Sequence, residues 1–133
     1  MENILFITLA EAIEIHRDQI ERYGGKPGIR DLSLLQSALA MPGASFEGEY
    51  LHPDLHAMAA AYAFHICKNH PFFDGNKRTA LVCALVFLSL HGIDINDPGE
   101  VLYRAMMDIA AGRLDKPGLA AVFRNLSGTD KNL

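Results

Sequence analysis

Residues 70–79 have the sequence HPFFDGNKRT and separate the two most apolar segments of the chain. The preceding segment, 55–69, follows the capping residue Asp54 and stops before Pro71, because the residue before a proline is disfavoured in the helical region. The following segment, 76–90, is apolar on nearly every face. We therefore predict two long helices joined by a polar loop, with the second of them at the centre of the fold.

Helical patterning continues outward on both sides of this pair. Residues 8–23 open with Thr8 and Glu11 at capping-box spacing and then place apolar residues at steps of three and four. Three more helices are expected between start and stop signals: from Asp31 or Ser33 to the break at Pro42, from Asp97-Pro98 to Gly112, and from Asp115 to about Leu126. No convincing run of strands remains, so the predicted class is all-α, a compact fold of about six helices.

The connector between residues 41 and 53 has a different character. It contains two glycines and two prolines, and its aromatic residues Phe46 and Tyr50 are separated by acidic ones. Connectors of this length in compact domains are more often functional than idle. We expect a loop or short hairpin here.

Length and composition limit the class of protein. The chain has 133 residues, 50% hydrophobic and 21% charged, which fits a single globular domain over 1–133, with frayed ends expected at 1–7 and 127–133. Twelve basic and 16 acidic residues give a net charge of −4, which disfavours direct nucleic-acid binding. No apolar stretch approaches the roughly 20 residues of a membrane span, and the acidic start of the chain argues against a signal peptide. Cys67 and Cys83 lie in apolar runs, as expected for reduced thiols in a cytoplasmic protein.

The polar loop concentrates groups suited to phosphate chemistry. If a helix begins near Asn76, its free amides and dipole favour an anion, and Lys77 and Arg78 add positive charge. Asp74 is a hard oxygen ligand suited to Mg²⁺, and Gly75 allows close backbone approach to a phosphate. His70 is a candidate general base at neutral pH. A capping histidine in a charged, solvent-facing loop is the structural alternative that residue chemistry alone leaves open.

The motif resembles the signature of the Fic/Doc superfamily. The Fic branch has HPFx(D/E)GNGRxxR and the Doc branch, named after the death-on-curing toxin, has HxFx(D/N)xNKR, which is the version in residues 70–78. The similarity extends to the GIRD turn at 28–31 and covers nearly all of residues 3–125. It implies that His70 is the general base, that Asp74 binds Mg²⁺ and that the stretch from Gly75 to Arg78 holds the phosphates of ATP.

Two positions bear on the reaction type. Lys77 stands where Fic proteins have a second glycine, and Leu81 stands where they have their last arginine. The resemblance to Doc therefore implies a protein kinase that moves the γ-phosphate of ATP to a Ser or Thr hydroxyl, with Lys77 and Arg78 as catalytic cations. The implied target is a translation factor such as elongation factor Tu. Gly75 is the Fic residue at a position where Doc proteins often have alanine, and AMP transfer of the Fic type is the first alternative. An inactive binding or regulatory module is the second.

The resemblance also implies partners. The 42–51 loop corresponds to the flap that holds an extended segment of the target protein, which makes Phe46 and Tyr50 candidate target contacts; hydrophobic anchoring of the loop explains them equally well. Ser45 and Glu49 have the spacing of a Fic inhibitory motif, but Tyr50 replaces its usual last residue. Without a built-in inhibitor, a Doc-type toxin needs a cognate antitoxin, and exposed apolar residues such as Ile13 and Val122 are candidate contacts for an antitoxin helix.

Overall fold

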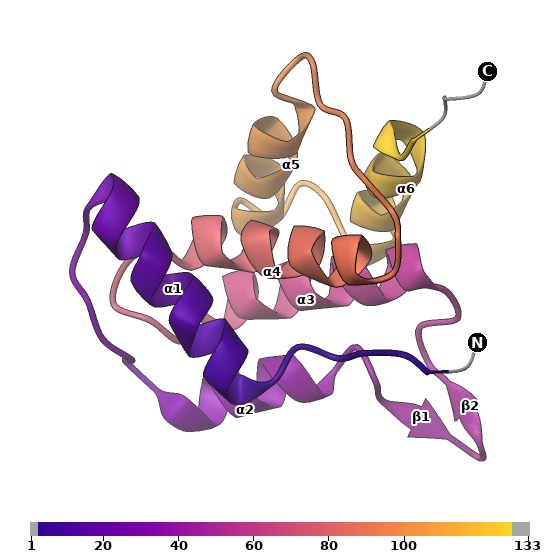
Figure 1. Ribbon diagram of the computed structural model, residues 1–133, viewed down its shortest axis with the longest axis horizontal. Helices are drawn as coiled ribbons and strands as arrows, with labels where there is room; N and C mark the ends of the chain where they lie inside the picture. Colours follow the sequence, from indigo (N-terminus) through magenta and orange to yellow (C-terminus); the bar gives the residue numbers. More distant parts are fainter. Residues whose placement is uncertain (1–2, 129–133) are drawn as a thin grey trace.

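The computed structural model describes residues 3–128, which form six helices and one short hairpin (Figure 1). The elements in chain order are α1 (Leu9–Tyr23), α2 (Leu32–Ala40), β1 (Ser45–Phe46), β2 (Glu49–Tyr50), α3 (Leu55–Asn69), α4 (Asn76–Leu90), α5 (Val101–Ala110) and α6 (Lys116–Leu126). The predicted all-α class and the short hairpin expected in the 41–53 connector are thus confirmed. None of the described helices is long and apolar enough to cross a membrane.

The central layer consists of α3 and α4, as the 55–90 pattern predicts. Helix α3 packs against α2, α4, α5 and α6, and α1 runs obliquely beside the N-terminal end of α4 (Figure 1). The buried residues form one contiguous cluster in which the largest fully buried side chains include Tyr62, Phe72, Phe87 and Phe123. Since Phe72 belongs to the loop between α3 and α4, that loop is anchored in the core.

Most helices begin where the sequence places a cap. Thr8 and Glu11 form the predicted capping box, and the carboxylates of Asp31, Asp54 and Asp115 each accept a hydrogen bond from an amide in the first turn of their helix. The prediction for the fifth helix is wrong by several residues. The Asp97 carboxylate does accept from the amides of Val101 and Leu102, at 2.8 and 2.9 Å, but it does so from outside the helix, across the intervening Pro98-Gly99-Glu100 turn.

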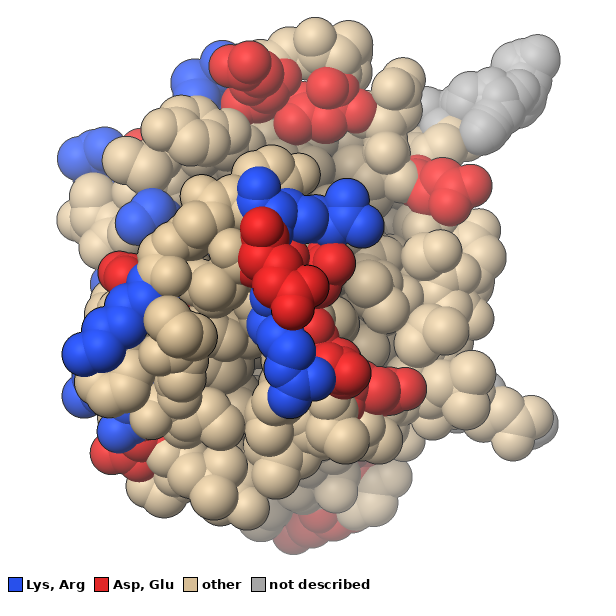
Figure 2. Space-filling model, turned by 60° about the vertical axis from the view of Figure 1, so that its left-hand side comes forward, with Lys and Arg blue, Asp and Glu red and all other residues tan. Residues whose placement is uncertain are grey.

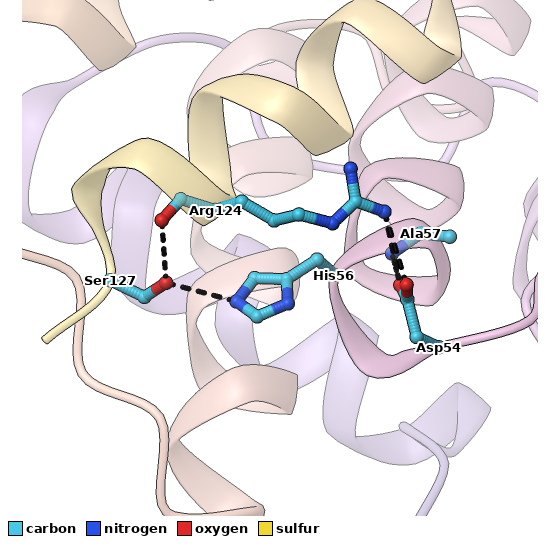
Figure 3. A network of polar contacts seen from close by, with 5 residues as sticks. All are labelled: Asp54, His56, Ala57, Arg124 and Ser127. Atoms are coloured by element: carbon cyan, nitrogen blue, oxygen red, sulfur yellow. Dashed lines mark hydrogen bonds and ion pairs between the residues drawn. The ribbon is translucent and has the colours of Figure 1, made fainter. Parts of the chain in front are cut away.

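The ends of the described chain are more ordered than the sequence indicates. Ile7 is buried and its amide donates to the Tyr62 hydroxyl at 2.7 Å, while the Leu5 amide donates to Nε2 of His91. At the other end, the Ser127 hydroxyl donates to the Arg124 carbonyl and accepts from Nε2 of His56 (Figure 3). Within the ends that were expected to be frayed, Leu5, Ile7 and Ser127 thus make hydrogen bonds to the rest of the fold; residues 1–2 and 129–133 lie outside the described part.

Helices α3 and α6 are tied together at the start of α3. The Asp54 carboxylate caps α3 through the Ala57 amide and pairs with the Arg124 guanidinium of α6 at 3.1 Å (Figure 3). Burial acts to raise the pKa of Asp54, but the hydrogen bond from the Ala57 amide and then the Arg124 guanidinium hold it below its usual value.

The apolar residues named as antitoxin contacts are not freely exposed. Ile13 and Val122 are both half-buried and pack against the core. The sequence predicts exposed residues here, whereas each side chain is partly covered by the core.

Candidate active site

The α3–α4 loop is framed by two residues in the left-handed region. His70 ends α3 with φ 53° and ψ 54°, and its amide still donates to the Ile66 carbonyl. Gly75 precedes α4 with φ 78°. A left-handed backbone is uncommon for residues other than glycine, and contacts from outside the loop stabilise it at His70.

Those contacts come from the connection between α1 and α2. Arg30 donates from Nε to the His70 carbonyl at 2.7 Å and from Nη2 to the Asn69 carbonyl at 3.1 Å. The amides of Arg30 and Asp31 both donate to the Pro71 carbonyl, and Ile29 forms a β-bridge with Phe72. The GIRD turn at 28–31 therefore lies alongside the loop and is joined to it by backbone hydrogen bonds.

The interior of the loop is closed by Asn76. Its side-chain oxygen accepts from the Phe72 amide at 3.0 Å, and its nitrogen donates to the Phe72 carbonyl at 2.9 Å. Asn76 is buried, with 6% of its surface exposed. Both ends of its amide group are thus occupied within the protein, and its side chain shapes the loop instead of pointing at a phosphate.

Asp74 lies on the outer side of the loop. Its Oδ2 accepts from the Lys26 amide at 2.6 Å, and within the described residues its Oδ1 accepts no hydrogen bond. Its backbone carbonyl lies 2.8 Å from Nε2 of His16. The Lys26 ammonium lies 4.3 Å from the centre of the exposed Phe73 ring. One carboxylate oxygen is therefore left to bind a cation.

A polar pocket of about 330 Å³ opens beside this loop, at the N-terminal end of α4. Its lining residues are Cys67, Lys68, His70, Phe73, Asp74, Gly75, Asn76, Lys77 and Ala110. Helix α4 has no side-chain cap, whereas α1, α2, α3 and α6 are capped by a side chain at the N-cap position and α5 by Asp97. Free amides, the positive end of the helix dipole and the Lys77 ammonium together favour an anion.

Arg78 does not line this pocket. Its Nη1 donates to the Gln19 carbonyl at 3.3 Å and its Nη2 to the Gly24 carbonyl at 3.0 Å, so the guanidinium binds the C-terminal end of α1. A cation is favoured there by the helix dipole. Arg78 thus joins α4 to α1, and the structure brings together only His70, Asp74, Gly75, Asn76 and Lys77 of the predicted site residues.

Comparison with known proteins identifies the family of the chain. The family model described as Fic/DOC family matches residues 6–88. The chain belongs to the Fic/DOC family. Protein kinase doc of Escherichia phage P1 is 33% identical over 123 residues, 92% of this chain and 96% of the relative. Toxin Doc of Mycolicibacterium smegmatis (strain ATCC 700084 / mc(2)155) is 40% identical over 73 residues, 55% of this chain and 56% of the relative.

The flap residues of this Fic/DOC chain lie outside the pocket. β1 and β2 pair antiparallel, with Phe46 opposite Glu49 and Ser45 opposite Tyr50. Phe46 is 67% exposed, and Tyr50 packs edge-on against Phe6 at a centroid distance of 6.2 Å. Tyr50 is 39% exposed despite this contact, so the rings of both residues keep accessible surface on the hairpin.

Three residues of this Fic/DOC site were not identified from the sequence. Arg30 and His16 hold the loop from outside, and Lys68 lines the pocket while its ammonium donates to the Ile109 carbonyl at 3.3 Å. His16 had one visible signal, since it interrupts an otherwise apolar face of α1. Nothing local distinguishes Arg30 or Lys68 from other surface cations.

The charge on this side of the Fic/DOC domain is mixed. Figure 2 turns the left-hand side of Figure 1 forward and shows basic and acidic side chains next to one another, with no broad patch of one sign. The positive potential for an anion therefore depends on local features of the pocket, namely the α4 terminus and Lys77, and not on the surface as a whole.

Proposed function

We propose that this protein is a toxin-type protein kinase that transfers the γ-phosphate of ATP to a Ser or Thr hydroxyl of a target protein. The observation that carries the proposal is the polar pocket at the uncapped end of α4, which joins His70, Asp74 and Lys77 in one cavity. The similarity to Protein kinase doc of Escherichia phage P1 supports a Doc-type kinase.

His70 is the proposed general base. Among the described residues it is the one histidine that lines the pocket, and it is exposed there. A neutral imidazole nitrogen can accept the proton of an attacking hydroxyl. The Arg30 and Pro71 hydrogen bonds hold its backbone so that the side chain starts from a defined position.

The residues present fit Mg²⁺ and a polyphosphate. Asp74 offers a carboxylate oxygen that no described residue uses, which is the single-carboxylate arrangement in which Mg²⁺ takes its other ligands from phosphate and water. Mg²⁺ supplies charge neutralisation of the transferring phosphate. Lys77 and the first amides of α4 are the proposed phosphate contacts. Asn76 and Arg78, whose side chains are engaged within the protein, are proposed to shape the loop and to position α4.

AMP transfer is the alternative reaction. It requires space for the α- and β-phosphates where this chain has the exposed Lys77, and a cation where it has Leu81, which is half-buried against the core. An aliphatic side chain cannot bind phosphate, so these two positions favour γ-phosphate transfer.

The exposed hairpin and the family membership suggest a target protein and an inhibitory partner. We propose that an extended target segment pairs with the hairpin beside Phe46, that elongation factor Tu is the first target to test, and that an antitoxin restrains the enzyme in the cytoplasm. Ile13 and Val122 are half-buried and keep part of their surface accessible to a helix of that antitoxin.

A labelling experiment distinguishes the candidate reactions. Purified protein, Mg²⁺ and elongation factor Tu are incubated with ATP labelled at either the α- or the γ-phosphate, in parallel with cell extract. The His70→Asn variant serves as the inactive comparison, because asparagine tolerates the left-handed backbone at this position. Label transferred only from the γ-position supports the kinase, and label only from the α-position supports AMP transfer. The absence of label from both positions, with wild type and variant alike, would support the non-enzymatic module.

A further inference from the structure

His16 lies on α1, outside the pocket, and touches the loop from behind. Its ring is stacked on Phe72 with centroids 3.8 Å apart and planes inclined by only 5°. Only 4% of its surface is exposed. A histidine so deeply buried must satisfy its polar nitrogens within the protein.

The hydrogen bond of His16 defines its tautomer. Nε2 lies 2.8 Å from the carbonyl oxygen of Asp74, and a carbonyl can only accept, so Nε2 carries the hydrogen. The ring therefore donates from Nε2 to the Asp74 carbonyl, on the side of the loop that faces α1.

This bond controls the direction of a peptide group in the pocket wall. The Asp74 carbonyl and the Gly75 amide belong to one trans peptide, in which the C=O and N–H point in opposite directions. Gly75 lines the pocket and His16 does not. When the carbonyl is held toward α1, the Gly75 N–H points away from α1, and no described residue accepts a hydrogen bond from it.

The peptide needs such a restraint because Gly75 is a glycine. At φ 78° glycine has no steric barrier that favours one orientation of the preceding peptide over its flipped form. A flip would turn the Asp74 carbonyl, with its partial negative charge, toward the side on which an anion binds. The His16 donor penalises that flip by the loss of a buried hydrogen bond.

We infer that His16 is a positioning residue that keeps the Asp74–Gly75 peptide oriented with its N–H toward a bound phosphate. The inference deepens the proposed function and rests on it. It assigns to α1 a role in nucleotide binding, with the stacked Phe72 ring fixing the plane of the imidazole.

The test distinguishes the effect of the His16 Nε2–H donor from the effect of ring packing on Phe72. His16→Phe keeps a flat ring on Phe72 and removes the N–H, while His16→Gln removes the ring but restores an amide N–H of similar reach. The control is His56→Phe, which removes the bond to Ser127 at the first turn of α3 (Figure 3), about 20 Å along that helix from the loop. Each variant is titrated with Mg²⁺-ATP while the ¹⁵N-labelled Gly75 amide is followed by NMR, and the His16 tautomer of the wild type is read from its ring ¹⁵N shifts.

The inference expects an Nε2–H tautomer and a Gly75 amide signal that shifts on ATP addition. His16→Phe should raise the Kd for ATP about tenfold, the equivalent of one neutral hydrogen bond, with a smaller effect in His16→Gln and none in His56→Phe. Equal ATP affinity in wild type and His16→Phe, or an Nδ1–H tautomer, would overturn the role of His16 and leave the kinase proposal standing. A wild-type protein that binds no ATP would overturn the proposed function and this inference with it.

Discussion

Arg30 donates from Nε to the carbonyl oxygen of His70 at 2.7 Å, across 40 positions of sequence. The same guanidinium binds the carbonyl of Asn69, so it closes the C-terminal end of α3, where the helix dipole favours a cation. The candidate base is thus held in its left-handed conformation by the connection between α1 and α2, none of whose residues is among those that line the pocket.

Replacing Arg30 by Met should reduce phosphate transfer more than stability. Loss of the two Arg30 hydrogen bonds lets the His70 backbone relax. A displacement of a catalytic side chain by about 1 Å lowers the rate on the order of 100-fold. The free energy of unfolding should fall by about 1–2 kcal/mol, since two charged hydrogen bonds at an exposed site are lost. Transfer rates and urea unfolding are measured together, with Arg17→Met, which breaks an ion pair with Glu14 on α1, as the control. Equal transfer rates in Arg30→Met and Arg17→Met would show that the Arg30 hydrogen bonds are not needed for activity.

His70→Asn should abolish transfer while preserving the fold. Removing a general base typically lowers a rate by about 10²–10⁴-fold. ATP binding should persist, because Lys77 and the α4 amides are unchanged. Transfer of labelled γ-phosphate and ATP binding by calorimetry are the measurements. The comparison variant is His70→Val, which should also destabilise the protein, since a β-branched residue is strained at φ 53°. Substantial transfer by His70→Asn would require a different base.

Asn76→Ala should unfold more readily than the wild type. The substitution removes both hydrogen bonds to the Phe72 backbone and leaves a buried amide and carbonyl unpaired, at a cost of about 2–4 kcal/mol. Urea denaturation measures the loss. If Asn76 instead served only to bind phosphate, the variant would keep its stability and show a raised KM for ATP, which is the opposite pattern.

Gly75→Ala and Gly112→Ala form a matched pair. Both glycines have φ 78°, so both substitutions carry the same backbone strain of about 1 kcal/mol. An added Cβ at Gly75 would lie 3.2 Å from Ile20 Cδ1 and 3.3 Å from Arg78 Nη2, whereas at Gly112 it would meet nothing within 4 Å. We expect Gly75→Ala to be the more destabilised of the two and to lose ATP affinity. Identical melting temperatures would mean that Ile20 and Arg78 yield without cost.

Stability should fall as the pH decreases from about 6.5 toward 4. Burial, together with Lys116 and His52, lowers the pKa of His65 to about 4, while its unfolded value is near 6.5. Within this window the unfolded chain binds more protons than the native protein, so acid favours unfolding. His16, His52 and His56, whose pKa values burial also lowers, add to the trend.

The His65→Gln variant tests the contribution of His65. Glutamine can still accept the hydrogen bond from the Lys116 ammonium but does not titrate. The free energy of unfolding is measured with urea at several pH values. It should change less steeply with pH in His65→Gln than in wild type, while Arg17→Met should keep the wild-type dependence on pH. An unchanged dependence on pH in His65→Gln would assign the acid sensitivity to the other histidines.

Features that depend on neighbours along the chain were predictable. Helix starts at Thr8, Asp31, Asp54 and Asp115 follow from caps that act within three residues, and the end of α3 follows from Pro71. Asp97 was correctly predicted to be a cap. Its carboxylate accepts from amides beyond the turn that follows it, so α5 begins at Val101 rather than directly after Asp97. The site was predicted as a loop between the two apolar helices, because the motif there is continuous in sequence.

The sequence by itself determined the helical class, the central position of α3 and α4 and the groups gathered at the α4 terminus, since short-range capping and apolar periodicity set all of these. Only the tertiary structure decided which side chains remain available to a ligand. Asn76 and Arg78 satisfy backbone groups of Phe72, Gln19 and Gly24, while His16 and Arg30 reach the loop from 58 and 40 positions away. Such partners are chosen by packing, because a buried carbonyl takes whichever donor the fold brings within about 3 Å.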